Sequence, residues 1–104
     1  MDFTVEVYQL TQSFPKCEIY GLTSQIQRAA SSIPSNIAEG AGRNTAADFA
    51  HFVDNAVGSA FEVETQLTLC KRLNYITEEQ YIKAIAEIQS IQKRLYQLIQ
   101  KLRG

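Results

Sequence analysis

Apolar residues recur every three to four positions along four stretches of this chain, the spacing that places side chains on one face of an α-helix. The four predicted helices cover about residues 2–12, from a start near 18–22 to about 40, 45–73 and 77–102. The chain has only two prolines and five glycines, and Pro15, Gly40 and Gly42 lie where the chain would turn between these stretches, which indicates short connections. Short connections favour antiparallel neighbours, so the pattern predicts an all-α, antiparallel up-down-up-down four-helix bundle.

The second predicted helix carries a proline within its buried stripe, which consists of Leu22, Ile26, Ala29, Ile33 and Ile37. Pro34 cannot donate a hydrogen bond to the carbonyl of Ala30. The stripe nevertheless keeps its phase, so we predict a kinked but continuous helix in which Ser31 and Ser32 satisfy the freed carbonyls. The Gly40–Gly42 segment is predicted to end this helix with a left-handed cap.

The third predicted helix is apolar on more than one side. Three of its apolar residues, Val57, Phe61 and Leu69, lie outside its main apolar stripe. A helix with two apolar sides needs two partner surfaces, and the pattern therefore indicates self-association.

Cap residues mark the ends of the last two predicted helices. Thr45 precedes Asp48 and is a predicted N-cap, with an acid near the positive end of the helix. Thr77 and Gln80 match a capping box at the start of the fourth helix. Asn74 is the predicted C-cap of the third helix, because asparagine tolerates left-handed backbone.

Composition limits the functional classes. Residues 1–104 suffice for one core and are predicted to form a single domain. Ten basic residues face eleven acidic ones, whereas a dedicated nucleic-acid binder usually carries a basic excess. No apolar run is long enough to span a bilayer, and no charged-then-apolar leader precedes the first helix. We therefore expect a cytoplasmic protein without a membrane partner.

Two cysteines, Cys17 and Cys70, are present. With no export signal they are expected to be reduced thiols, and a disulfide between them is the alternative. Lys71 and Arg72 could lower the pKa of Cys70. Because Cys70 lies on the apolar stripe, we interpret it as an inert core thiol.

The most specific signal lies between residues 14 and 43. It includes the run Ser32-Ile33-Pro34-Ser35-Asn36-Ile37-Ala38-Glu39-Gly40, preceded by Phe14-Pro15, Tyr20-Gly21-Leu22 and Arg28-Ala29-Ala30. Downstream positions continue it at Gly42-Arg43, Phe49, Phe52, Gly58-Ser59, Glu62 and Glu64-Thr65-Gln66-Leu67. Over about residues 14–76 the chain thus resembles the bacterial four-helix-bundle family of 23S rRNA intervening-sequence proteins.

The resemblance implies a bundle that assembles into a homo-oligomeric ring of five subunits. Some relatives are encoded within inserts of ribosomal RNA genes, and one branch resembles RNA-binding accessory proteins of retroelement reverse transcriptases. This chain is weakly acidic, so the RNA role of that branch is expected to transfer poorly. The chain also departs from the family pattern at Asn74, where glycine is usual, and at its short first helix, from which a leading turn or two is expected to be missing.

Four charged residues are candidates for structural ion pairs: Arg28, Glu39, Glu62 and Glu64. Arg28 lies beside the apolar stripe, where an unpaired buried charge would be costly. Glu62 and Glu64 point to different sides of the third helix. We predict that Arg28 pairs with one of them, either between helices or at a subunit contact; a ligand site is the alternative.

The Gly40–Arg43 segment is interpreted as an interhelix turn, and an anion site at the next helix N-terminus, assisted by Arg43, is the alternative. Asp48 and His51 have the spacing of carboxylate-bridged metal bundles, but the chain has one histidine and no second pair. We therefore predict no metal site. No catalytic constellation, cofactor or small-molecule substrate is predicted either.

The end of the fourth predicted helix is the only region in which all charged residues have the same sign. After Glu87 it contains no acid and four cations, Lys93, Arg94, Lys101 and Arg103. One interpretation is that these cations interact favourably with the negative end of the helix dipole. The alternative is that they form, with Arg43, a basic patch that binds RNA or an acidic protein, and that a ring would carry one such patch per subunit.

These features together predict a non-enzymatic interaction or scaffold protein that binds copies of itself. The alternative is an RNA-binding accessory protein that acts with a ribonucleoprotein or reverse transcriptase partner. Salt-dependent RNA binding would distinguish the second from the first.

Overall fold

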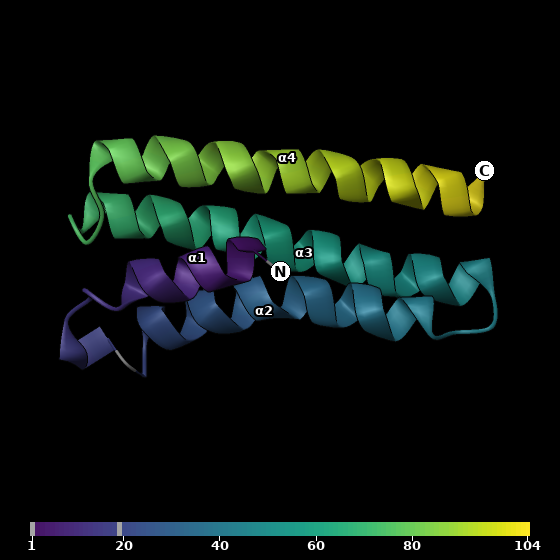
Figure 1. Ribbon diagram of the computed structural model, residues 1–104, viewed down its shortest axis with the longest axis horizontal. Helices are drawn as coiled ribbons and strands as arrows, with labels where there is room; N and C mark the ends of the chain where they lie inside the picture. The colour runs from purple at the N-terminus through teal and green to yellow at the C-terminus, as the bar shows by residue number, and fades with distance from the viewer. Residues whose placement is uncertain (1, 19) are drawn as a thin grey trace.

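The computed structural model describes residues 2–18 and 20–104, apart from the side chains of residues 2 and 17. Within these residues the chain forms four α-helices and one short 3-10 helix: α1 (Asp2–Thr11), η1 (Lys16–Glu18), α2 (Leu22–Ala41), α3 (Ala46–Arg72) and α4 (Glu78–Arg103). The helices run alternately up and down along an elongated molecule of 43 × 24 × 18 Å (Figure 1). The predicted all-α, antiparallel four-helix bundle is confirmed.

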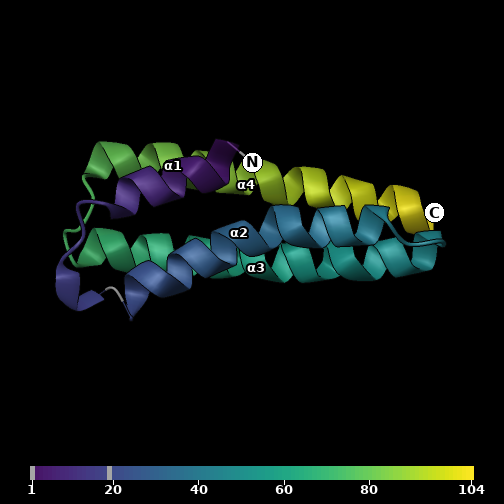
Figure 2. The same ribbon diagram turned by 60° about the horizontal axis from the view of Figure 1, so that its bottom comes forward.

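The helices differ greatly in length, and this difference shapes the molecule. Helix α3 lies between α2 and α4 (Figure 1). Helix α1 packs on α2 and covers only the half of the bundle that contains the α3–α4 connection (Figure 2). At 1.5 Å per residue, the 10 residues of α1 span only ~15 Å, against ~40 Å for the 27 residues of α3. The bundle therefore has four helices in cross-section at one end and three at the other.

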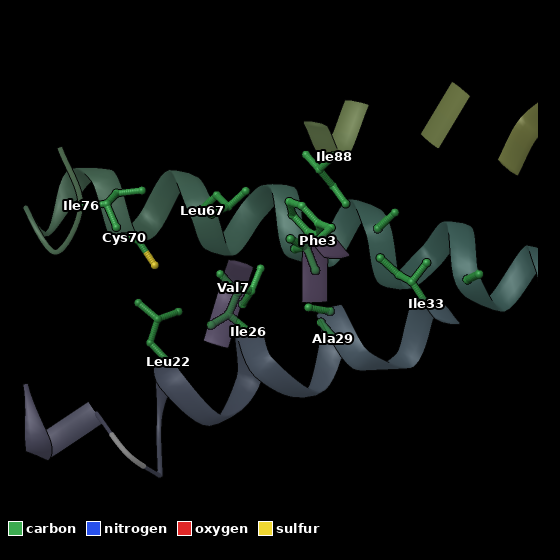
Figure 3. Close-up of a cluster of buried hydrophobic side chains, with 14 of the residues drawn as sticks. Phe3, Val7, Leu22, Ile26, Ala29, Ile33, Leu67, Cys70, Ile76 and Ile88 are labelled. Carbon is green, nitrogen blue, oxygen red and sulfur yellow. The ribbon is translucent and has the colours of Figure 1, made fainter. Parts of the chain in front are cut away.

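The core lies between α2 and α3 and is closed by α1 and α4. Figure 3 shows Ile26 and Ala29 of α2 facing the α3 side chains, with Val7 of α1 among them and Ile88 of α4 entering from the opposite side. Ile26, Leu67 and Ile88 are completely buried. Burying side chains of this size stabilises the fold by roughly 1.5–3 kcal/mol each, which explains how a chain of this length forms one core.

One end of the bundle is closed by contacts between its two connections. The Tyr75 hydroxyl donates to Glu18 Oε2 at 2.7 Å, and the Tyr75 ring packs against Phe14 with centroids 5.2 Å apart. The other carboxylate oxygen of Glu18 accepts from the backbone N–H of Leu22 at 3.3 Å. Glu18 therefore caps the first turn of α2 and also joins the segment before α2 to the α3–α4 connection.

Pro34 lies inside α2, which continues without a break, as predicted. The predicted role of Ser31 and Ser32 is wrong. The carbonyl of Ala30, which Pro34 leaves without its helical donor, accepts a hydrogen bond from Thr4 Oγ1 at 3.2 Å. Ser31 donates to the carbonyl of Arg28 instead. The proline thus creates an acceptor that anchors α1 on α2.

We expect Thr4→Val to lower the free energy of unfolding by about 1 kcal/mol, because it removes the donor for the Ala30 carbonyl at nearly constant volume. In a Pro34→Ala background the new N–H of residue 34 can bond that carbonyl, so the same change at Thr4 should cost much less. Urea denaturation of the four proteins of this double-mutant cycle measures the coupling. If Thr4→Val lowers the free energy of unfolding equally in both backgrounds, the Thr4 hydroxyl does not compensate for the hydrogen bond that Pro34 cannot donate to the Ala30 carbonyl.

Both predicted N-caps are confirmed, whereas the C-cap of α3 is Leu73 and the predicted Asn74 follows it. Thr45 accepts from the backbone N–H of Asp48 at 3.1 Å, and both hydrogen bonds of the Thr77 capping box are present. Asn74 has the left-handed φ of 62°. The prediction for Gly42 is wrong: its φ is −83°, and α2 ends in ordinary right-handed backbone. A left-handed cap therefore does not explain why a glycine occupies position 42.

Candidate interaction surfaces

The most specific segment of the sequence forms a polar layer between α2 and α3. Ser32 Oγ and Ser59 Oγ lie 2.8 Å apart across the two helices. Asn36 Nδ2 donates to the Ser32 carbonyl at 2.8 Å and to Ser32 Oγ at 3.0 Å. These small, mutually bonded side chains fix the register of α2 against α3. The motif is therefore accounted for by packing within the chain.

Gly40 lies where α2 packs tightly against α3. A Cβ atom at this position would lie 2.8 Å from Phe49 Cδ1 and 2.9 Å from Phe52 Cβ. Both distances are too short for a side chain, so Gly40 lets the backbone of α2 lie directly against the two phenylalanines of α3.

Arg43 closes the α2–α3 turn next to this contact. Its guanidinium lies 4.8 Å from the centre of the Phe52 ring, and Nη2 lies 3.1 Å from Glu39 Oε1. Both partners are within the same hairpin. These contacts favour the interhelix-turn interpretation of the Gly40–Arg43 segment over an anion site. They also give Glu39 an ion-pair partner. The spacing of four residues between Glu39 and Arg43 at a helix end could have indicated this pair from the sequence alone.

Arg28, Glu62 and Glu64 are not brought together within the chain. Arg28 is exposed and donates to Ser24 Oγ at 3.2 Å. Glu64 accepts from Gln92 Nε2 at 2.7 Å, and its other oxygen accepts from Gln89 at 3.3 Å, so it links α3 to α4. The ion pairs among residues 2–18 and 20–104 do not include Arg28. Pairing of Arg28 across a subunit contact stays a prediction.

The cations of the α4 tail do not share one surface. Arg94 and Lys101 are seven residues apart and lie along one line of the helix, whereas Arg103 is about half a turn around the axis from Arg94. Arg103 forms an ion pair with Asp54 of α3. The exposed residues Lys93, Arg94 and Lys101 have no ion pair within the described residues. The predicted patch of Arg43, Lys93, Arg94, Lys101 and Arg103 is thus reduced to three unpaired cations.

An apolar groove runs between α2 and α4 beyond the start of α1. Its volume is about 950 Å³. Side chains of three helices line it, chiefly Phe3, Ile33, Ile37, Ala38, Ile91 and Leu95. The groove occupies the half of the bundle that α1 is too short to cover, and periodicity alone did not indicate it.

The outer face of α3, which points away from α2 and α4, carries exposed apolar side chains. Phe61 and Leu69 are 55% and 46% exposed, and Leu73, just beyond the helix end, is also exposed. Gly58 lies one turn before Phe61, and no atom lies within 4 Å of where its Cβ would be. Val57 packs against the core, so it does not belong to this face.

Two acids meet where α1 approaches α4. The pKa of Glu87 is raised above 4.5, chiefly by a side-chain hydrogen bond with Glu6. Partial burial and the charge of Glu6 raise it further, whereas the charge of Lys83 lowers it. A hydrogen bond between two carboxyl groups requires that they share a proton. When the pH rises above the raised pKa of Glu87, this proton is lost and the two side chains repel.

We expect Glu87→Gln to stabilise the protein at pH 7, by about 0.5 kcal/mol, the scale of exposed charge pairs. The raised pKa means that the folded state binds this proton more tightly than the unfolded state does. The stabilisation by the shared proton is therefore present below about pH 4.5 and is lost as pH rises through the raised value. Thermal unfolding of wild type and variant at pH 4 and pH 7 tests this. A difference that is the same at both pH values would contradict it; Glu79→Gln, on an exposed turn of α4, is the control.

Neither the histidine nor the buried thiol lies in a catalytic arrangement. His51 is exposed on α3, and its ring and that of Phe52 lie in a T-shaped arrangement with centroids 5.8 Å apart. Burial raises the pKa of Cys70 to about 12, and the thiol is free, so it is an inert core thiol. Lys71 forms an ion pair with Glu78 at 2.9 Å. Cys17, the other half of the possible disulfide, has a side chain outside the described part.

None of the helices in the described residues combines the length and apolar character needed to cross a membrane. The described residues also hold no group of three or more histidine, cysteine or acidic side chains that could bind a metal ion. The fold and its surfaces thus define a small helical-bundle protein whose notable features are packing contacts and apolar faces.

Comparison with known proteins identifies the family. The sequence profile of the family described as 23S rRNA-intervening sequence protein matches residues 1–97, and the chain belongs to this family. A search of curated proteins found no match. Among solved structures, the chain is similar to a protein of unknown function from the S23 ribosomal protein family of Bacteroides thetaiotaomicron. The two share 31% identity and a TM-score of 0.84 over 94% of this chain and 92% of the other.

Sequence reasoning missed several residues that matter in the structure. Glu18 and Thr4 act through partners 57 and 26 residues away, and no local spacing signals such contacts. The groove could have been anticipated from the lengths of the predicted helices, because an 11-residue first helix cannot cover two helices that are twice as long.

Proposed function

We propose that this protein is a non-enzymatic scaffold that assembles with copies of itself through the outer face of α3 and offers its remaining surfaces to a partner. Neither the family nor the similar structure carries an assigned activity. The single observation that supports the proposal is the exposed apolar stripe of Phe61, Leu69 and Leu73.

Gly58 strengthens the case for self-association. Glycine in an exposed helix interior costs about 1 kcal/mol relative to alanine, and the chain itself offers no packing reason for it. A second helix that approaches closely at this position would supply the reason, because a side chain would hold the two backbones apart. The stripe and the glycine lie on one face, so a single contact between copies could use both.

The ring of five subunits implied by the family resemblance is our proposed form of this assembly. A ring requires that each copy contact its neighbours through two different patches, since only a heterologous contact continues around a closed cycle. The α3 face supplies one of them. The buried, free Cys70 fits a reducing compartment, and we propose the cytoplasm.

RNA binding is the second candidate. Lys93, Arg94 and Lys101 are exposed, and the ring would repeat them around its circumference. Against it, the chain carries a net charge of −1, and two of the five candidate cations are engaged by acids of the same chain. An acidic protein partner satisfies the same cations without a basic excess.

Size-exclusion chromatography with light scattering, recorded at 260 and 280 nm on protein from its own host, tests both candidates. We expect a closed oligomer free of nucleic acid. A monomer at micromolar concentration would contradict the scaffold proposal. A particle whose excess absorbance at 260 nm is removed by high salt would establish RNA binding instead. Lys93→Glu and Lys101→Glu would then be the first variants to examine.

A further inference from the structure

The groove between α2 and α4 continues the line of α1. Helix α1 occupies the space between α2 and the first half of α4, where Phe3 and Val7 enter the core. The groove begins at Phe3 and Thr4 and extends along Pro34 and Ala41 of α2. The groove therefore lies beyond the N-terminal end of α1, in the three-helix half of the molecule.

The lining of the groove fits a helix rather than a compact ligand. Ala38, Ala41 and Ala86 are exposed along its edges, and these small side chains let another backbone approach closely. Ile37 and Ile91 are only partly buried and would be covered by an apolar stripe. Amphipathic helices commonly bind grooves of this kind through apolar residues spaced three or four apart.

Two charges on α4 line the same groove. Glu87 and Arg94 are seven residues apart, which places them on one line of the helix about 10 Å from each other. Arg94 has no ion pair within the described residues. Glu6 and Lys83 line the adjacent hollow between α1 and α4 together with Glu87, so two carboxyl groups and one cation lie at this end of the groove. A complementary ligand therefore carries a cation at one end and an anion two turns away.

We propose that the groove binds an amphipathic α-helix of a partner protein, with a basic residue facing Glu87 and an acidic residue facing Arg94 two turns further along. The inference rests on the proposed scaffold function, for which it names the kind of partner. A second copy that places its α3 face in the groove is the other occupant, and the sedimentation measurement below separates it from a partner helix.

A displayed library of 18-residue helices tests the proposal. The helices carry a fixed leucine and alanine stripe, with the flanking positions randomised among Glu, Lys and Gln. They are sorted against the wild-type protein and against the charge-reversed variant Glu87→Lys/Arg94→Glu. We expect a Lys and a Glu seven positions apart in one order for wild type and in the opposite order for the variant. A selected wild-type binder should lose roughly tenfold in affinity for the variant, since two attractions become repulsions.

Two control proteins separate groove binding from other effects. Glu79→Lys/Lys93→Glu reverses two exposed charges of α4 outside the groove and should leave affinity unchanged. Ala38→Leu/Ala86→Leu fills the groove and should abolish binding, with circular dichroism showing that the variant is folded. No selected binder, no charge order, or binding that survives the filled groove would each overturn the proposal.

Sedimentation of the same proteins distinguishes this inference from the proposed assembly. If Ala38→Leu/Ala86→Leu dissociates the oligomer, a second copy occupies the groove and the inference is wrong. If the wild-type protein is monomeric yet binds the charge-ordered helices, the ring proposal fails and the groove inference stands.

Discussion

Gly40→Leu should lower the free energy of unfolding by about 3 kcal/mol, at the upper end of the usual cost of overpacking. Even the first carbon of the new side chain would lie 2.8 Å from Phe49 and 2.9 Å from Phe52. The contact with Phe52 is to Cβ, which cannot move away without the backbone, so α2 and α3 must separate locally. The gain in helix propensity from replacing glycine, about 1 kcal/mol, is too small to offset this. For a domain of this length the melting temperature should fall by roughly 15 °C.

Ala38→Leu is the matched control for this measurement. It adds the same side chain to the same helix two residues earlier, but into the open groove, and should change the melting temperature little. Chemical denaturation and calorimetry of both variants make the comparison. A Gly40→Leu protein as stable as wild type would show that the phenylalanines can move aside and that the close approach is not required.

If the protein assembles through the outer face of α3 as proposed, Phe61→Glu/Leu69→Glu should convert the assembly to folded monomers. Both side chains are exposed in the single chain, so the change costs the monomer little. If a neighbouring copy covers them, each copy would bury unpaired charges, at a cost of about 3 kcal/mol or roughly a hundredfold in association. Sedimentation velocity over a range of concentrations measures the shift.

Ile82→Glu/Tyr96→Glu provides the control, because it places two acids at comparably exposed apolar residues of α4. We expect this variant to assemble like wild type. If it dissociates while Phe61→Glu/Leu69→Glu does not, the contact between copies lies on α4 and the α3 face has another role.

The bundle could be predicted from sequence because its determinants are local. The stripe that continues across Pro34 and the capping box at Thr77 each depend on residues within a few positions of one another. Side-chain periodicity and cap chemistry act at that range, and the helices followed from them to within a few residues at each end. The family resemblance added the likeness to known bundles, which the profile match and the similar structure confirm.

The surfaces could not be predicted in the same way, because they depend on which distant side chains meet. Arg28 was placed near the apolar stripe by spacing, yet it lies far enough around α2 to be exposed and to bond Ser24. The four cations of the α4 tail are close in sequence, but the rotation of the helix sends Arg103 to Asp54 and away from Arg94. The donor for the Ala30 carbonyl came from α1, not from the neighbouring serines.

The turn between α2 and α3 has a consequence for how the chain folds. Only residues 42–45 separate these two helices, so the polar layer and the Gly40 contact are made by a hairpin that needs little loop closure. We expect this hairpin to form the folding nucleus, with α4 adding next and α1 last. Changes at Gly40 should therefore slow folding, whereas Thr4→Val should mainly speed unfolding. Assembly would then begin from chains in which α3 is already in place and α1 is still joining the bundle.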